Sequence, residues 1–250
     1  MCWSGEASAV LAVIGLGTAA YVAMKNESKE LWIPLTFFAL MELLQAFTYA
    51  YIDDCSNPVN QVLTLFGYLH IAFQPFFINM VAMYFIPESV KLKIRTTVYT
   101  LCAVAALAMI VKMMPFAWAG LCTIGTEAVC GTQVCSTSGA WHIAWQLPLN
   151  DIMSPPNTWL TGFEGGLHGF AYLLIAFYLP ILYGSWRFVS FHYLVGPLLA
   201  DALTDDPNEF AAVWCLFSIA LCVSIIKSPI RKYLHVKTWP FYHRTVSDSL

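Results

Sequence analysis

Long apolar runs separated by short polar segments fill most of the chain. Runs of about 20 apolar residues match the length of an α-helix that crosses the hydrocarbon core of a bilayer. The pattern therefore predicts an all-α fold, an integral membrane bundle of about seven transmembrane helices in a single domain, residues 1–250. The predicted spans are residues 7–24, 31–51, 59–85, 97–114, 165–183, 188–202 and 209–226.

Two segments outside these spans differ from the short connectors. Residues 115–160 form a long connector that contains Pro148, Pro155 and Pro156. A connector of this length is typical of a functional lid or a small folded cap. Residues 227–250 form a polar tail with several basic residues. We expect the connector 115–160 to cap one face of the bundle and the tail 227–250 to leave the other.

Composition strengthens the membrane prediction. Of the 250 residues, 59% are hydrophobic and 11% are charged, whereas about a quarter of the residues in soluble domains are charged. So few polar residues could not cover a soluble core of this size. We expect a multi-pass protein of a plasma, inner or endomembrane, with the lipid bilayer as its first partner. No basic cluster is interleaved with exposed aromatics, so nucleic acid is not an expected partner.

The basic residues predict the orientation. When the spans alternate in direction, 11 of the 12 Lys and Arg residues fall on one side, and only Lys112 falls on the other. Positive charge marks the cytosolic side of a membrane protein. We therefore expect the N-terminus and the cap to lie outside and the basic tail 227–250 to lie in the cytosol.

Five cysteines fall on the predicted outer side. An oxidising compartment favours disulfides there, and five cysteines allow two bridges with one residue left over. The bridges are expected to join the long connector to itself and to the second or the N-terminal connector. A metal site at Cys130 and Cys135 is the alternative. The candidates are Cys2, Cys55, Cys122, Cys130 and Cys135, whereas Cys102, Cys215 and Cys222 lie within spans and are expected in the core.

Ionisable residues inside the spans are the first functional candidates, because each is costly at membrane depth. Glu42 lies near the middle of the second span and His70 near the middle of the third. A short connector makes these spans antiparallel neighbours, so the two side chains could meet. Two further histidines lie at different depths, His168 in the outer part of the fifth span and His192 in the inner part of the sixth.

The first functional hypothesis is a membrane-embedded metal-dependent enzyme, such as a lipid hydrolase. Carboxylate and imidazole are the usual ligands of zinc and iron. Glu42, His70 and His168 would bind the metal, and a metal-bound water would attack a lipid or small-molecule substrate. Glu42 and His70 would be the catalytic residues. Supporting residues would be Gln45, Gln74, Glu164 and His192.

Two other hypotheses use the same residues differently. Glu42 and His70 could form the proton or cation site of a transporter or channel. Alternatively, the polar groups could only tie helices together in a structural subunit of a membrane assembly. A separate residue, His142, lies between Trp141 and Trp145 in the long connector. It is either part of an interfacial aromatic belt or a lid residue over an outward-facing cavity.

Several short stretches carry a family resemblance. The chain opens Met1-Cys2-Trp3-Ser4, carries Met-Glu-Leu-Leu-Gln at residues 41–45 and has Gln74-Pro75 in the third span. Together they resemble an uncharacterised family of small multi-span membrane proteins from microbes and large DNA viruses. That family has its Gln/Glu pair in the opposite order. The resemblance covers about the first third of the chain and implies a multi-span membrane fold with no known activity.

Overall fold

The computed structural model describes residues 3–125, 127–152, 170–240 and 242. Over these residues, five helices are long and apolar enough to cross a membrane. This confirms the all-α prediction and is consistent with a membrane protein. The five helices are α1 (Gly5–Met24), α2 (Lys29–Tyr49), α3 (Pro58–Tyr84), α4 (Glu88–Val111) and α9 (Pro207–Lys227).

Polar residues directly before the first turn start four of these helices. The side chains of Ser4, Ser28, Asn57 and Asp206 each accept a hydrogen bond from a backbone N–H of the first turn. Such N-caps satisfy donors that have no partner within the helix. The connectors that the sequence pattern identified therefore also fix where the helices begin.

Among the described residues of the predicted fifth and sixth spans, the helices are shorter. Helix α5 (Phe170–Leu173), the π-helical turn η1 (Leu174–Tyr178) and α6 (Leu179–Leu182) form one helical stretch. It is followed by α7 (Trp186–Val195) and α8 (Pro197–Asp201), and a last helix, α10 (Ile230–Leu234), follows α9.

The predicted sixth span is therefore not one helix. It is interrupted at Gly196, whose φ and ψ of −102° and −92° are not helical. Pro197 disfavours a helical conformation in the residue before it. A Cβ at position 196 would also lie 2.6 Å from the indole nitrogen of Trp214. Together these constraints explain why the apolar run at residues 188–202 breaks at this point.

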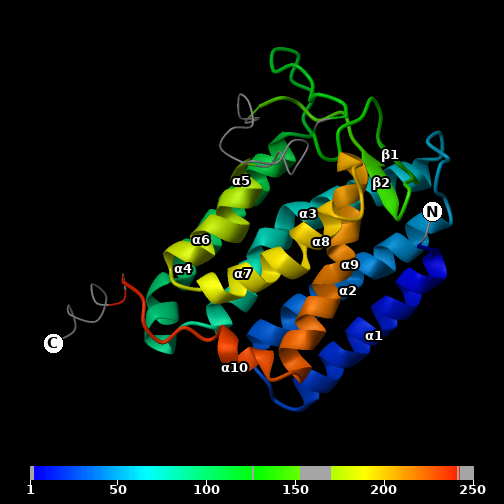
Figure 1. Ribbon diagram of the computed structural model, residues 1–250. Helices are drawn as coiled ribbons and strands as arrows, with labels where there is room; N and C mark the ends of the chain where they lie inside the picture. The colour runs from blue at the N-terminus through cyan, green and yellow to red at the C-terminus, as the bar shows by residue number, and fades with distance from the viewer. Residues whose placement is uncertain (1–2, 126, 153–169, 241, 243–250) are drawn as a thin grey trace.

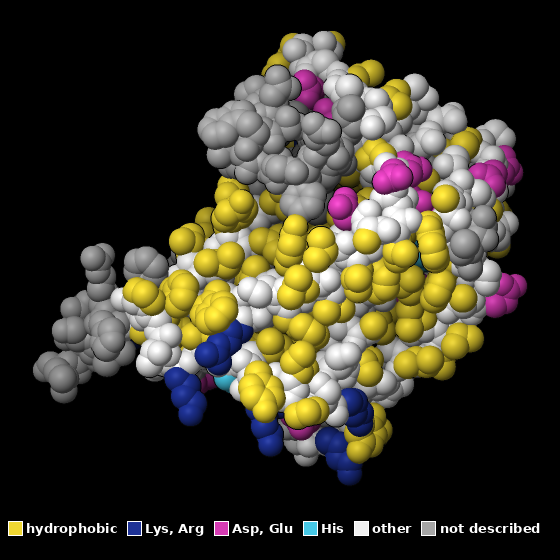
Figure 2. Space-filling model, viewed as in Figure 1, with side chains coloured by type: hydrophobic (Ala, Val, Ile, Leu, Met, Phe, Trp, Pro, Cys, Tyr) yellow, Lys and Arg dark blue, Asp and Glu magenta, His cyan; other side chains and the backbone are white. Residues whose placement is uncertain are grey.

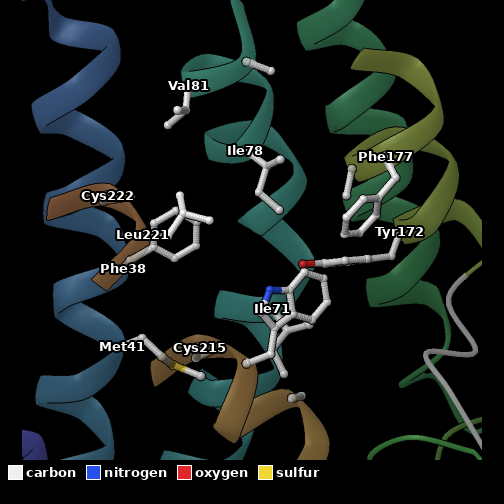
Figure 3. Close-up of a cluster of buried hydrophobic side chains, with 14 of the residues drawn as sticks. Phe38, Met41, Ile71, Ile78, Val81, Tyr172, Phe177, Cys215, Leu221 and Cys222 are labelled. Carbon is white, nitrogen blue, oxygen red and sulfur yellow. The ribbon is translucent and has the colours of Figure 1, made fainter. Parts of the chain in front are cut away.

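The long helices run side by side between two ends of the molecule, with the cap over one end (Figure 1). Helix α1 packs against α2 through small residues, because a Cβ on Gly15 would lie only 2.7 Å from the Cβ of Ala39. Helices α2, α3 and α9 surround the interior. Figure 3 shows apolar side chains from α2, α3, α9 and the 170–182 stretch meeting there, including Phe38, Ile78, Phe177 and Leu221.

Apolar side chains also cover the outside of the bundle. Figure 2 shows a broad hydrophobic belt, with Lys and Arg gathered at one end and Asp and Glu toward the cap. Exposed members of the belt include Val13, Phe66, Val104 and Leu182. A contiguous apolar surface of this kind is what a bilayer would cover.

The cap contains two β-strands, which the sequence pattern did not predict. Strands β1 (Cys135–Ser138) and β2 (Ile143–Gln146) form an antiparallel hairpin in which Cys135 pairs with Gln146. The hairpin contacts α3 and α9 at one end of the bundle. The cap is therefore folded onto the helices.

Two disulfides hold this cap. Cys122–Cys130 closes the long connector on itself, and Cys55–Cys135 joins it to the connector after α2. Both types of bridge were predicted, and Cys130 and Cys135 are thereby used as disulfide partners. Cys102, Cys215 and Cys222 are buried free thiols, as expected. The fifth outer candidate, Cys2, lies outside the described residues.

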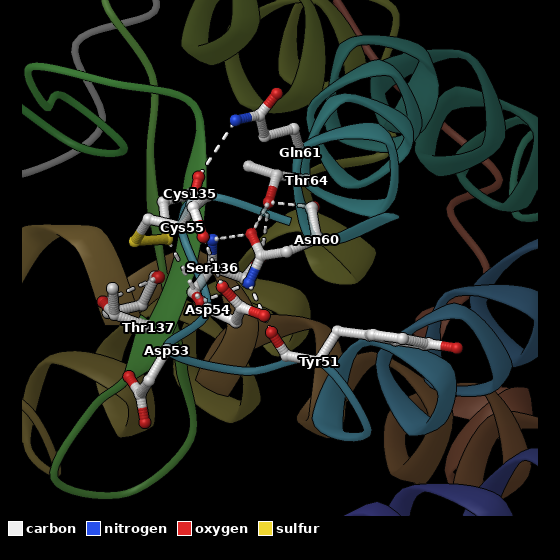
Figure 4. Close-up of a disulfide and its surroundings, with 12 residues drawn as sticks. Tyr51, Asp53, Asp54, Cys55, Asn60, Gln61, Thr64, Cys135, Ser136 and Thr137 are labelled. Carbon is white, nitrogen blue, oxygen red and sulfur yellow. Dashed lines mark hydrogen bonds between the residues drawn. A yellow bond between two sulfur atoms is a disulfide. The ribbon is translucent and has the colours of Figure 1, made fainter. Parts of the chain in front are cut away.

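Asn60 attaches the hairpin to α3 beside the second disulfide (Figure 4). Its Nδ2 donates to the carbonyls of Tyr51 and Ser136 at 2.8 and 2.9 Å. Its Oδ1 accepts the Ser136 N–H at 2.9 Å, and the hydroxyls of Ser136 and Thr64 lie 2.7 Å apart. The buried amide side chain of Asn60 thus forms hydrogen bonds with backbone groups of two connectors. Without Asn60, these backbone groups would be buried without hydrogen-bond partners.

Candidate functional site

Glu42 and Gln45 lie on one face of α2, one turn apart, and both are fully buried. With the Gln45 amide nitrogen facing the carboxyl group, Nε2 lies 3.0 and 3.3 Å from the two Glu42 oxygens. Ser8 of α1 provides a second hydrogen bond to the carboxyl group, and the Trp3 indole donates to the Ser8 hydroxyl at 2.8 Å. Glu42 therefore lies in a polar cluster between α1 and α2, and its neighbours there (Gln45, Ser8 and Trp3) carry no charge.

His70 has different neighbours. Its ring stacks on Phe37 of α2 with centroids 3.7 Å apart, and Phe37 stacks in turn on Phe77. Phe37 and Glu42 are five residues apart on α2, which places them about 140° apart around the helix. Helix α2 presents Phe37 to His70 and Glu42 to Ser8, so the contacts of Glu42 and His70 do not join them. Within the described chain, His70 Nε2 is buried and has no hydrogen-bond partner.

The described residues contain no group of three His, Cys, Asp or Glu side chains that could hold a metal ion. Two predicted members of the site, His168 and Glu164, lie outside these residues. The ligand set of Glu42, His70 and His168 therefore stays a prediction.

Gln74 connects three helices. The Tyr172 hydroxyl of α5 donates to Gln74 Oε1 at 2.8 Å, and Gln74 Nε2 donates to the Cys215 sulfur of α9 at 2.9 Å. All three side chains are buried. Figure 3 shows Tyr172 extending from the 170–182 stretch toward α3, with Cys215 on the neighbouring α9.

A second amide side chain, Asn79, also connects helices, and it lies closer to the C-terminal end of α3. Its Nδ2 donates to the carbonyl of Pro75 at 2.8 Å and to that of Ile175, in the π-helical turn, at 2.7 Å. The Tyr183 hydroxyl donates to Asn79 Oδ1 at 2.9 Å. Backbone carbonyls exposed by irregular helices need such partners inside a membrane.

His192 lies in an aromatic cluster between α7 and α9. The Trp214 indole donates to His192 Nε2 at 3.3 Å, and the imidazole stacks on Phe177 with a 5.1 Å centroid separation. Phe188 stacks on it as well. No hydrogen-bond partner for its Nδ1 is present among the residues with defined positions. This predicted supporting residue therefore packs away from the Glu42 cluster.

A buried carboxyl group of α9 binds the hairpin of the cap. Glu209, in the first turn of α9, accepts the backbone N–H groups of Trp141 and His142 and the Thr204 hydroxyl. A Cβ on Gly139 would lie 2.6 Å from its carboxyl carbon, so the hairpin turn needs glycine there. The residues Asp-Pro-Asn-Glu at the start of α9 are typical of a helix N-terminus. The contact of Glu209 with the hairpin depends on the tertiary structure and cannot be predicted from this motif.

His142 is fully enclosed beside this carboxylate. Its Nδ1 accepts the Ile143 N–H at 2.8 Å and lies 3.1 Å from the Tyr49 hydroxyl, and its ring stacks on Trp3. Burial lowers the pKa of His142 from 6.5 to about 3. This residue is neither a belt residue nor an exposed lid group, because 1% of its surface is accessible.

Lys112, the one basic residue expected on the outer side, is also buried. Its Nζ lies 3.8 Å from a carboxylate oxygen of Glu127. Both residues line a small cavity of about 40 Å³ beneath the cap, which Tyr68 and Tyr172 also border. The exception to the charge rule is thus a residue enclosed by the cap.

Comparison with known proteins identifies a family for the chain. No curated protein and no solved structure matches it. A family model described as a family of unknown function (DUF5765) matches residues 6–235. This match extends the resemblance of the first third to most of the chain and confirms the prediction of an uncharacterised family. The chain belongs to the DUF5765 family of unknown function.

Proposed function

We propose that the chain crosses the membrane seven times, with the N-terminus and the cap outside and the basic end in the cytosol. The hydrophobic belt and the separation of charge in Figure 2 support this arrangement. The 170–182 stretch and the α7–α8 pair supply the two crossings beyond the five long helices. Arg187, at the start of α7, donates to carbonyls of Tyr233 and His235 near the basic end.

Within this arrangement, the protein acts as a structural subunit of a membrane assembly. The strongest support comes from the hydrogen bonds of Gln74. Its amide oxygen accepts from Tyr172 and its amide nitrogen donates to Cys215, and these partners belong to two other helices. Asn79 forms the same kind of junction. Interhelical hydrogen bonds of this type stabilise a membrane bundle. Polar side chains that are hydrogen-bonded to one another are better suited to holding helices together than to catalysis.

The test compares metal content and stability in purified protein. We expect no stoichiometric zinc or iron in the wild type. We expect the Gln74→Leu substitution to lower the free energy of unfolding by about 1 kcal/mol. Phe73→Leu is the matched control, because Phe73 is a neighbouring side chain on the exposed surface of α3. In native membranes, cross-linking should give a species larger than the 27.9 kDa chain.

The same experiment decides on the metal-dependent lipid hydrolase. Near-stoichiometric zinc or iron in the wild type, lost in both Glu42→Gln and His70→Ala, would overturn the structural proposal. Lipid substrates would then be screened with His168→Ala as a third variant. Metal that is retained in both variants would instead indicate a site elsewhere in the chain and argue against these ligands.

Proton or cation handling at Glu42 is a second candidate. A fully buried carboxyl group whose partners are Gln45 and Ser8 supports it, since ionisable groups inside membranes commonly mark ion pathways. In proteoliposomes with an imposed pH gradient, a transporter would dissipate the gradient and Glu42→Gln would not. Equal proton fluxes in both proteins and in empty liposomes would exclude this function.

A further inference from the structure

A shallow groove lies on the membrane-facing side of α1 near the basic end. Its floor is open at Gly17, because a Cβ built there would meet no other atom within 4 Å. Val13 and Ile14, which border the groove, are 71% and 51% exposed. The lining residues are Val13, Ile14, Gly17, Thr18 and Tyr21 from α1 and Lys227 from the end of α9.

Two lysines converge on the polar end of this groove. Lys227 Nζ lies 4.2 Å from the centroid of the Tyr21 ring, and Lys25 Nζ lies 5.8 Å from it. The ring face attracts both ammonium groups. The Tyr21 side chain thus holds two positive charges at the boundary between the apolar belt and the basic end.

Two of the neighbouring basic residues at this end have carboxylate partners. Lys91 pairs with Glu30 and Glu88, and Arg231 pairs with Glu27 at 2.8 Å. Over the part of the chain with defined positions, neither Lys25 nor Lys227 forms a salt bridge. The groove therefore joins an uncompensated pair of positive charges to an exposed apolar channel.

We propose that this groove binds an anionic glycerophospholipid of the cytosolic leaflet. The phosphate group lies between Lys25 and Lys227, and an acyl chain runs past Gly17 along Val13 and Ile14. Basic pockets beside membrane helices on the cytosolic side attract anionic head groups in this way. The choice of leaflet rests on the proposed orientation, whereas the binding of the lipid does not.

The experiment measures lipid binding to delipidated protein in detergent by native mass spectrometry. Phosphatidylglycerol and phosphatidylcholine with identical chains are titrated in parallel. We expect the wild type to prefer phosphatidylglycerol, and Lys25→Gln/Lys227→Gln to lose about fivefold in its affinity per lysine removed. Gly17→Leu, which fills the groove, should weaken the binding of both lipids.

Lys29→Gln/Lys237→Gln is the matched control, because it removes the same charge from two exposed basic residues outside the groove. This control should bind phosphatidylglycerol as the wild type does. Equal affinities for the two lipids in the wild type would overturn the proposal, and so would an equal loss in the control variant. Competition by glycerol 3-phosphate at the lipid's own concentration would show that a free phosphate, and not a lipid, is the ligand.

Detergent solution contains no leaflets, so this result is independent of the orientation. Unchanged thermal stability and a monodisperse elution profile of each variant show that a lost affinity does not come from misfolding. A failure of lipid binding would leave the seven-span arrangement in place. Side-specific labelling, described below, tests that arrangement separately.

Discussion

His142 is a buried base whose protonation opposes folding of the cap. Its Nδ1 already accepts the Ile143 N–H, and burial lowers its pKa from 6.5 to about 3. The unfolded chain therefore binds a proton between these pH values while the folded protein does not. The stability that the neutral imidazole contributes is complete above pH 6.5 and is lost as the pH falls toward 3, by up to about 1.4 kcal/mol per pH unit.

The measurement is thermal unfolding in nanodiscs between pH 7.5 and pH 5. We expect His142→Gln to flatten the decrease in stability that the wild type shows on acidification, even if the variant is less stable at neutral pH. The change of slope separates titration from a simple loss of packing. Identical slopes for the two proteins would show that His142 does not titrate on unfolding.

At the scale of the structural elements, the stability of the cap depends on two disulfides that differ greatly in sequence separation. Cys55–Cys135 spans 80 residues, including α3 and α4, whereas Cys122–Cys130 spans 8. A bridge over a longer segment removes more conformational freedom from the unfolded chain. Replacing Cys55 and Cys135 by Ser should therefore cost about 2 kcal/mol more than replacing Cys122 and Cys130.

Thermal unfolding of the two double variants in the same bilayer checks this order. A reducing agent should lower the stability of the wild type below that of either variant, since it removes both bridges. A larger loss for the Cys122/Cys130 variant would show that local order in the connector 115–160 matters more than the link to the bundle.

For the whole molecule, the seven-span arrangement predicts the side of each connector. Cysteines placed at Ala140 and Asp205, both exposed, should react with a membrane-impermeant maleimide in intact cells. Cysteines placed at Lys29 and Lys237 should react only after permeabilisation. Cys102, Cys215 and Cys222 are buried free thiols and should stay unlabelled, and the unmodified protein measures this background.

Labelling at Ala140 but not at Asp205 in intact cells would contradict the crossing of the membrane by the 170–182 stretch and the α7–α8 pair. Labelling at Lys29 in intact cells would reverse the proposed orientation. Either result would leave the helical bundle itself unchanged, because its packing does not depend on which side faces the cytosol.

Apolar runs and turn residues in the sequence were enough to predict four of the five long helices to within two residues at each end. Helix α4 begins at Glu88, nine residues before the predicted start at residue 97, because its first turns carry charged residues that are not part of the apolar run. A bilayer imposes one length on every crossing helix, so hydropathy carries this information locally. The same reasoning predicted two outer disulfides, since oxidation depends on which side the cysteines face. It also identified Glu42, Gln45, Gln74 and His192 as residues at membrane depth, and all four are buried.

The neighbours of these residues were decided by tertiary structure. The angular positions of Phe37 and Glu42 on α2 place His70 against an aromatic ring and Glu42 against Ser8. Residues far apart in the chain, such as Gln74 and Cys215, meet only because three helices pack together. The position of the hairpin in the cap likewise depends on contacts with α9. A sequence pattern records the polarity and spacing of side chains along one helix, whereas the partner of each side chain depends on how the other helices are rotated against it.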